Sequence, residues 1–221
     1  MTRVKVCGVT TEAGLETVVD AGADAVGILC DVTVDTPREV SLERASDLIE
    51  AAPPFVTTVL VTMATDPGRT AELLEEATPD AIQLHGDVSP DDLESLRTAT
   101  DATILLAVDA DDLADADRYD ELVDGLVVDS TDEDGAGGTG ETHDWERTRM
   151  ETARLESPVI LAGGLDPDNV GDAIQAVDPF AVDVSSGVEA EEGRKDPDAV
   201  NSFVARAGRA ATVQSEASPS P

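Results

Sequence analysis

The chain has 221 residues, of which 41% are hydrophobic, and this is enough material for one globular domain with a buried core. It carries 48 acidic and 14 basic residues, so the formal net charge is -34, and such a surface is a poor partner for nucleic acid or an anionic membrane. No segment approaches the ~20 apolar residues of a membrane span, and the N-terminus lacks the pattern of a signal peptide, so we expect a cytoplasmic protein.

The acidic residues recur in every predicted helix and loop instead of gathering in one tail. We interpret them as a solvated surface adapted to concentrated salt, where counterions screen the repulsion between like charges. Two of the basic residues are lysines, Lys5 and Lys195. The two cysteines, Cys7 and Cys30, are too few for a disulfide framework, which agrees with a reducing compartment.

Along the chain, short segments rich in β-branched residues alternate with longer amphipathic segments. Strands are predicted at 3–7, 24–29, 55–61, 80–84, 103–107, 125–128, 158–162 and 180–184. Helices are predicted at 11–21, 41–51, 68–77, 89–98, 111–117, 142–154, 167–176 and 196–209. The strand segments are continuously apolar, which is typical of parallel strands covered by helices.

Capping residues support several of the helix starts. Ser41 precedes an amphipathic segment, and its hydroxyl is a good acceptor for the free N–H groups of a first turn. Ser89-Pro90, Asp166-Pro167 and Asp196-Pro197 each place a capping side chain before a proline at the first helical position. These pairs therefore mark the starts of three of the predicted helices.

Strict alternation of strands and helices predicts an α/β protein, a single-domain (β/α)8 barrel of the TIM type over residues 1–209. An open doubly wound sheet is the alternative, but it usually carries a phosphate loop after its first strand, where this chain has "CGVT". Residues 210–221 are rich in Ala, Ser and Pro, and we expect them to form a disordered C-terminal tail.

In such a barrel the active site is built from the C-terminal ends of the strands and the loops that follow them. Cys7 ends the first strand, Asp129 follows the sixth, and Arg38 is the one basic residue of the loop after the second. A thiol and a carboxylate on opposite sides of a barrel can serve as base and acid, and an arginine fork suits a substrate carboxylate. A buried core cysteine and a capping aspartate are the structural alternatives.

Glycine-rich loops follow the last three strands, and each precedes a helix. They contain Gly138 and Gly140, then Gly163 and Gly164, and finally Ser185, Ser186 and Gly187. Such loops bring backbone N–H groups to an anion, and the loops after strands seven and eight are the usual phosphate site of this fold. We therefore expect phosphate binding and a phosphorylated small-molecule substrate.

His85 and His143 are the only histidines, too few for a metal centre of the kind that sugar-phosphate epimerases use. We interpret both as structural or supporting residues. The sequence contains no Walker motif, CxxC pair or zinc pattern. We therefore expect no metal centre of these kinds.

A set of motifs then resembles one known family in its order along the chain. These are "KVCGVT", "TPREV", "QLHG", "VVDS", "GGTGETHDW", "LAGGLDPDNV", "VDVSSGVE" and "GRKD". Together they resemble the phosphoribosylanthranilate isomerase family over residues 3 to about 207. The resemblance implies an isomerase of tryptophan biosynthesis that acts without a cofactor.

The implied reaction is the Amadori rearrangement of N-(5-phosphoribosyl)anthranilate to 1-(2-carboxyphenylamino)-1-deoxyribulose 5-phosphate. By the resemblance, Asp129 is the general acid that opens the ribose ring, and Cys7 is the general base that removes the C2′ proton. Arg38 holds the anthranilate carboxylate, and the glycine-rich loops bind the phosphate. The loop after the second strand is poorer in aromatic residues than the family pattern, and His143 stands where an aromatic residue is common.

Two other classes of function stay open at this point. Another phosphate-binding barrel enzyme, such as a sugar-phosphate epimerase or a thiamine phosphate synthase, needs metal ligands or a pyrophosphate–magnesium site. A non-catalytic barrel that binds a phosphorylated metabolite needs no acid–base pair. The sequence allows a monomer or a homodimer. Because Cys7 and Cys30 end adjacent predicted strands, oxidation to a disulfide is a further hypothesis.

The charge interpretation predicts a salt-dependent stability. Raising KCl from about 0.1 M to about 3 M screens the acidic surface, so the melting temperature is expected to rise by at least about 4 °C, or roughly 1 kcal/mol. Circular dichroism at constant pH measures the shift. A melting temperature that is flat over this range contradicts the adaptation.

Overall fold

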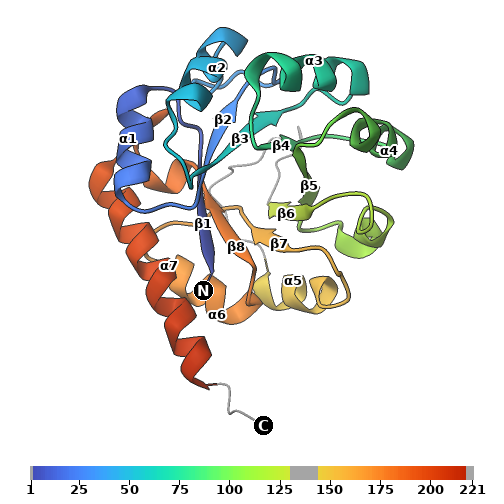
Figure 1. Cartoon of the computed structure of the whole chain (residues 1–221). Coiled ribbons are helices and arrows are strands. Elements are labelled where there is room, and N and C mark those ends of the chain that lie inside the picture. The colour runs from blue at the N-terminus through green and yellow to red at the C-terminus, as the bar shows by residue number, and fades with distance from the viewer. Residues whose placement is uncertain (1, 130–143, 218–221) are drawn as a thin grey trace.

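The computed structural model describes residues 2–129 and 144–217, and these form a closed barrel of eight parallel strands surrounded by helices (Figure 1). The strands are β1 (Arg3–Cys7), β2 (Ala25–Leu29), β3 (Thr57–Thr62), β4 (Ala81–Leu84), β5 (Thr103–Asp109), β6 (Gly125–Asp129), β7 (Val159–Leu161) and β8 (Ala181–Val184). The α-helices are α1 (Glu12–Asp20), α2 (Leu42–Ala51), α3 (Pro67–Ala77), α4 (Pro90–Ala99), α5 (Trp145–Thr152), α6 (Val170–Val177) and α7 (Pro197–Ala217).

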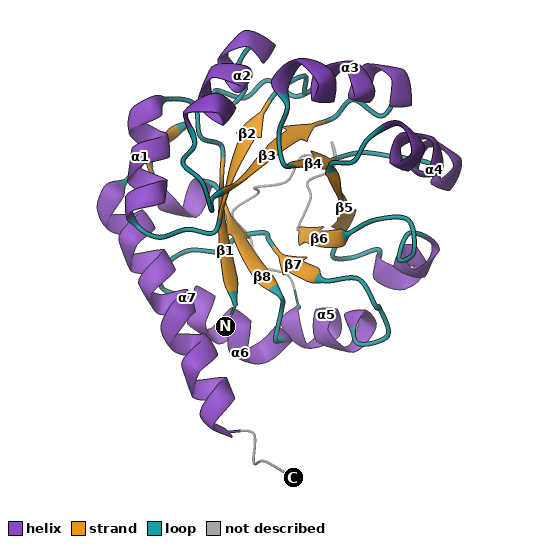
Figure 2. Ribbon diagram, in the orientation of Figure 1, coloured by secondary structure: helices purple, strands orange, loops and turns teal. Residues whose placement is uncertain are grey.

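Each strand pairs in parallel with its neighbours in the chain, and β1 closes the ring by pairing with β8. Figure 2 shows the strands enclosed by the helices, which cover the outside of the barrel. This confirms the predicted (β/α)8 barrel. Among the described residues, no helix combines the length and the apolarity that crossing a membrane requires.

The period of two along a strand divides the core into an inner and an outer layer. In β1, Val4 and Val6 belong to an outer cluster that also contains residues of α1, α6 and α7. Cys7 belongs to the inner cluster, with Val59, Val127 and other strand residues that point into the barrel. The first strand therefore delivers every second side chain to the interior, and the last of these is the thiol.

Most of the predicted caps are formed as the sequence indicated. The Ser41 Oγ accepts from the Arg44 N–H at 3.2 Å, and the Ser89 Oγ accepts from the Asp92 N–H at 3.2 Å. The Asp196 Oδ1 likewise accepts from two N–H groups in the first turn of α7, at 2.8 and 3.0 Å. Local side-chain chemistry thus determines where these helices begin.

The helix after β7 begins later than predicted, at Val170 instead of 167. The Asp166 Oδ1 accepts from the backbone N–H groups of Asp168 and Asn169, so the residues before Val170 form a turn held by side chains. The Asn169 amide strengthens this turn by donating to the Gly164 carbonyl at 2.8 Å. The turn keeps the loop after β7 compact where it faces the barrel mouth.

Four further elements differ from the prediction. The segment predicted as a helix at 111–117 is a 3-10 helix, η1 (Leu113–Arg118), and its N-cap residue makes no side-chain capping bond. After β8 a short 3-10 helix, η2 (Ser186–Val188), leads into an antiparallel hairpin of β9 (Glu189–Glu191) and β10 (Arg194–Lys195). These strands are short and charged, so their sequence lacks the alternation that predicts a strand.

The expected disordered tail at 210–221 is helical for much of its length, because α7 continues to Ala217. Residues 210–217, "AATVQSEA", contain no proline or glycine, and alanine is the best helix former. The prolines that stop a helix come later, at 219 and 221, outside the described residues. The part of this segment that the structure describes, residues 210–217, therefore continues α7.

Candidate active site

A cavity of about 710 Å³ opens at the end of the barrel where the strands terminate. It is lined by residues that follow or end the strands, among them Cys7, Arg38, Asp129, Gly163, Gly164, Ser185 and Ser186. The sequence predicts that all of these residues lie at one site. Gly187 lies next to this lining, in η2, and Gly138 and Gly140 lie outside the described residues.

Cys7 is buried at the end of β1 and faces the interior, beside Lys5 of the same strand. A Cβ built on the neighbouring Gly27 would be 2.7 Å from the Cys7 Sγ and 3.1 Å from the Lys5 Nζ, so the thiol and the ammonium both crowd this glycine. Burial raises the pKa of the Cys7 thiol above its ordinary value, and the Lys5 and Lys195 charges oppose part of that rise.

A buried ion pair fixes Lys5. Its Nζ donates to the Asp183 Oδ2 at 2.6 Å, and the two residues are register partners on β1 and β8. Both side chains are almost fully buried, at 5% and 7% exposure, so each charge depends on the other. The pair places a cation directly beneath the thiol.

Asp129 ends β6 and is 8% exposed. Its strand is separated from β1 by β7 and β8 around the barrel, so its carboxylate and the Cys7 thiol reach the cavity from different sides. Its backbone carbonyl accepts from the Ala110 N–H at 2.9 Å, which joins the strand end to the end of β5. The acid and the base predicted from the sequence therefore line the same cavity.

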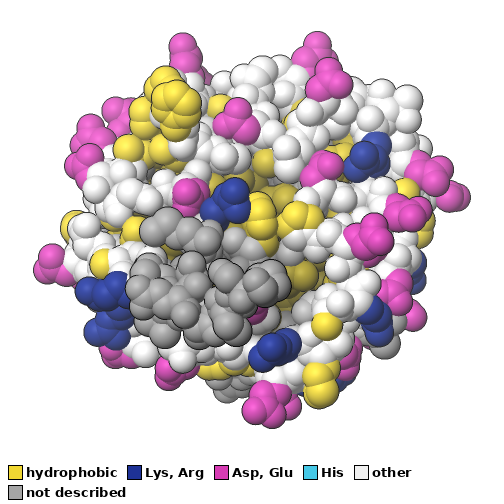
Figure 3. All heavy atoms as spheres, turned by 60° about the horizontal axis from the view of Figure 1, so that its bottom comes forward, with side chains coloured by type: hydrophobic (Ala, Val, Ile, Leu, Met, Phe, Trp, Pro, Cys, Tyr) yellow, Lys and Arg dark blue, Asp and Glu magenta, His cyan; other side chains and the backbone are white. Residues whose placement is uncertain are grey.

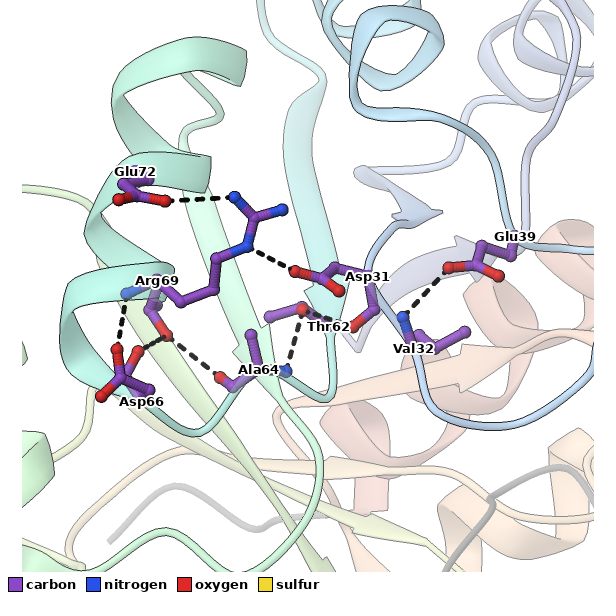
Figure 4. A network of polar contacts seen from close by, with 9 residues as sticks. Asp31, Val32, Glu39, Thr62, Ala64, Asp66, Arg69 and Glu72 are labelled. Atoms are coloured by element: carbon purple, nitrogen blue, oxygen red, sulfur yellow. Dashed lines mark hydrogen bonds and ion pairs between the residues drawn. The ribbon is translucent and has the colours of Figure 1, made fainter.

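Arg38 lies on the loop after β2, and this loop is fastened at its base (Figure 4). The Arg69 Nε of α3 donates to the Asp31 Oδ2 at 2.7 Å, and the Thr62 hydroxyl donates to the Asp31 carbonyl at 3.0 Å. The Val32 N–H donates to the Glu39 Oε1 at 3.1 Å, so the two ends of the loop are joined. The loop thereby carries Arg38 back to the cavity.

The loops after β7 and β8 form the other side of the cavity. Gly163 and Gly164 have φ of 82° and 59°, in the left-handed region that glycine adopts without strain. A Cβ on Gly187 would collide with the Leu165 carbonyl, so only glycine lets these two loops pack together. The sequence signal of repeated glycines thus reflects a real close approach between the two turns.

His85, interpreted from the sequence as a structural or supporting residue, lines the cavity beside Gln83. The Nε2 atoms of His85 and Gln83 are 2.6 Å apart. Burial lowers the pKa of His85 to about 4, so the imidazole is neutral at neutral pH and accepts from the Gln83 amide. His143 lies outside the described residues.

Four buried charged residues of the site were not predicted: Lys5, Asp183, Glu189 and Lys195. The Lys195 Nζ donates to the Glu189 Oε1 at 2.7 Å, and Glu189 also holds Arg38. The sequence did carry a signal for two of them, because Lys5 and Lys195 are the two lysines of a chain with a net charge of -34. In the structure both lysines are buried, at 4% and 6% exposure. Among the described residues, no group of three His, Cys, Asp or Glu side chains is arranged to hold a metal ion.

The disulfide hypothesis is wrong for this structure. Both cysteines are free, and they occupy different layers of the core. Cys7 belongs to the cluster inside the barrel, whereas Cys30 packs with Leu48 and other residues of the helix-facing layer. Side chains that lie on opposite faces of a sheet do not meet the geometry of a disulfide.

The chain is also similar to known proteins. The model of the family described as N-(5'phosphoribosyl)anthranilate (PRA) isomerase matches residues 4–206. An N-(5'-phosphoribosyl)anthranilate isomerase of Halorubrum lacusprofundi is 57% identical over 209 residues, which cover 95% of this chain and 98% of that protein.

Solved structures agree with this similarity. Phosphoribosyl anthranilate isomerase from Thermotoga maritima has a TM-score of 0.84 and 34% identity, covering 95% of this chain and all of that one. A phosphoribosyl anthranilate isomerase in complex with reduced 1-(o-carboxyphenylamino)-1-deoxyribulose 5-phosphate has a TM-score of 0.82 and 32% identity, with 95% and 100% coverage.

Replacing Gly27 by alanine is expected to push the Cys7 sulfur out of place. The new Cβ would stand 2.7 Å from the Sγ and 3.1 Å from the Cys7 Cα, and overpacking of this kind costs about 1–3 kcal/mol of unfolding free energy. Urea unfolding at constant KCl measures it.

The matched control is Gly171→Ala, since a Cβ there meets nothing within 4 Å and the residue lies in α6. This variant is expected to be neutral or stabilising by up to about 1 kcal/mol. Equal effects of the two substitutions would contradict the close contact between β2 and the thiol.

Proposed function

Because the chain belongs to the N-(5'-phosphoribosyl)anthranilate isomerase family, we propose that it isomerises this substrate with Cys7 as the general base and Asp129 as the general acid. The observation that supports these roles is their shared cavity. A buried thiol and a buried carboxylate reach it from different strands, with an arginine and two glycine-rich turns in the same lining. This combination suits a substrate that carries both a carboxylate and a phosphate.

The first step opens the ribose ring. Asp129, in its protonated form, donates its proton to the ring oxygen, and the bond between C1′ and that oxygen breaks. The lone pair of the anilino nitrogen forms the C=N bond of a Schiff base, so the charge is carried by the nitrogen. A carboxyl group enclosed in the cavity delivers its proton at a fixed place, which is the condition for general acid catalysis.

The second step removes a proton from carbon. The Cys7 thiolate takes the C2′ proton, the electron pair forms a C1′=C2′ double bond, and the cationic nitrogen becomes neutral. The enolamine then gives the ketone when the C2′ hydroxyl loses its proton and C1′ gains one. Lys5 stabilises the thiolate form, because its positive charge lies beside the sulfur.

Arg38 and the loops after β7 and β8 orient the substrate between the two groups. Arg38 presents a planar guanidinium at one part of the lining, and Gly163, Gly164, Ser185 and Ser186 present backbone at another. Binding an anion at each end of the molecule aligns its C1′–C2′ bond with the acid and the base. The proposed chemistry moves protons only, so it uses neither a redox group nor a group carrier.

The surface fits a salt-rich environment. Acidic side chains are spread over the face drawn in Figure 3, and lysine and arginine side chains are few there. The similar protein of Halorubrum lacusprofundi belongs to a halophilic source, in line with the net charge of -34. We propose that the enzyme works in concentrated salt.

Substitution of either proposed group is expected to remove most of the activity. Cys7→Ser and Asp129→Asn should each lower kcat by about 10²–10⁴-fold, because each step loses its proton acceptor or donor. Anthranilate-type fluorescence in about 3 M KCl follows consumption of the substrate.

Cys30→Ser is the matched control for the thiol, because Cys30 is also buried but lies in the helix-facing layer. It should keep the kcat of the unchanged enzyme. Full activity of Cys7→Ser or of Asp129→Asn would overturn the assignment, and an inactive unchanged chain would overturn the function.

A further inference from the structure

We propose that Glu189 is a positioning residue for Arg38, and that it holds one edge of the guanidinium so that the other edge receives the carboxylate of the substrate. The inference rests on the proposed function, which gives Arg38 the substrate carboxylate. Glu189 itself does not touch the reacting atoms in this arrangement. It acts through the arginine.

The contact between the two side chains is bidentate. The Arg38 Nε donates to the Glu189 Oε1 at 3.0 Å, and the Arg38 Nη2 donates to the Glu189 Oε2 at 2.7 Å. The Arg38 side chain is 20% exposed and that of Glu189 is 4% exposed, so the contact is only partly solvated. Fork geometry of this kind fixes the plane and the direction of a guanidinium.

A guanidinium has five N–H donors, and Glu189 uses two of them. The donors that remain are both hydrogens of Nη1 and one of Nη2. One hydrogen on each of these nitrogens forms a second fork, at the end of the side chain. Arg38 lines the cavity, so this second fork is the edge available to a carboxylate there.

Glu189 is itself held from three sides. Besides Arg38, the Lys195 Nζ donates to its Oε1 at 2.7 Å, and the Gly193 N–H donates to its Oε2 at 3.2 Å. Burial acts to raise the pKa of Glu189, but the hydrogen bonds from Arg38 and Lys195 outweigh it and lower the pKa below its ordinary value. Glu189 is therefore an ionised and immobilised acceptor.

The β9–β10 hairpin, which carries Glu189 and Lys195, also contacts the loop of Arg38 and the turn after β8. A Cβ on Gly193 would be 2.8 Å from the Pro37 carbonyl, so the hairpin turn rests on the residue before Arg38. The Lys195 Nζ also donates to the Ser185 carbonyl at 3.1 Å. The β9–β10 hairpin therefore joins the arginine to the glycine-rich turn proposed for the phosphate.

Other anchors of the loop do not reach the guanidinium. The Asp31–Arg69 contact and the Val32–Glu39 hydrogen bond in Figure 4 fasten the base of the loop. Within residues 2–129 and 144–217, the Arg38 side chain donates its hydrogen bonds to Glu189. The direction of the Arg38 guanidinium therefore depends on Glu189, which lies on β9, after the last barrel strand.

The test compares two substrates, N-(5'-phosphoribosyl)anthranilate and N-(5'-phosphoribosyl)aniline, which lacks the carboxylate. The ratio of their kcat/KM values measures how well the enzyme uses the carboxylate, and it does not depend on the fraction of folded protein. The proteins are the unchanged chain, Arg38→Met, Glu189→Gln and Glu191→Gln, in about 3 M KCl.

We expect a ratio well above one for the unchanged chain and a ratio near one for Arg38→Met. Glu189→Gln should lower the ratio by about tenfold or more, mainly through KM for the natural substrate, because its amide cannot accept both Arg38 donors. Glu191→Gln is the matched control, since Glu191 lies on the same hairpin and is exposed, and it should keep the ratio. Glu189→Asp keeps the charge and should recover part of the ratio.

The inference is overturned if Glu189→Gln keeps the full ratio, even where both substrates lose activity equally, because an equal loss reports a structural role. If Glu189→Gln does not fold, Glu189→Asp decides in the same way, since an unchanged ratio overturns the proposal and a lowered one supports it. Failure of the proposed function looks different. In that case the unchanged chain turns over neither substrate, or Arg38→Met leaves the ratio intact.

Discussion

Positive charge buried at the mouth of the barrel is the constraint on which the site depends. The chain has a net charge of -34, and its surface repels an anionic substrate at moderate salt. Yet both lysines are buried at the site, and each is paired with an acid, Lys5 with Asp183 and Lys195 with Glu189, which also pairs with Arg38. The cations are held by paired acids below and beside the cavity, next to the glycine-rich turns that are proposed to bind the phosphate.

These ion pairs also organise the elements around the site. Lys5 and Asp183 join the first and last strands at the point where the barrel closes, beneath the Cys7 thiol. Glu189 joins the loop after β2 to the hairpin after β8. Removing one member of a buried pair leaves the other charge uncompensated, so these pairs hold the surroundings of the Cys7 thiol and the Arg38 guanidinium in place.

Much of the fold and part of the site were predictable from local patterns. Apolar segments alternated with amphipathic ones, and caps such as Ser41 and Ser89 marked helix starts, so the barrel and its strand ends followed. Cys7, Arg38 and Asp129 then had to lie at one mouth, because all parallel strands end there. The beginning of α6 was misplaced, since the Asn169 side chain closes a turn that only its contact with Gly164 reveals. The end of α7 was misplaced because composition alone does not separate an alanine-rich helix from a tail.

The sequence by itself determined the barrel, the polarity of its strands and the set of residues at its mouth, because strand periodicity, capping and glycine placement are local properties. Only the tertiary structure decided which charges meet. Lys5 and Asp183 are far apart in sequence, as are Arg38 and Glu189, and the charged hairpin of Glu189 has no strand-like alternation. It also decided that Cys7 faces inward while Cys30 faces the helices. Such pairings depend on barrel closure and strand register, which bring together residues from the two ends of the chain.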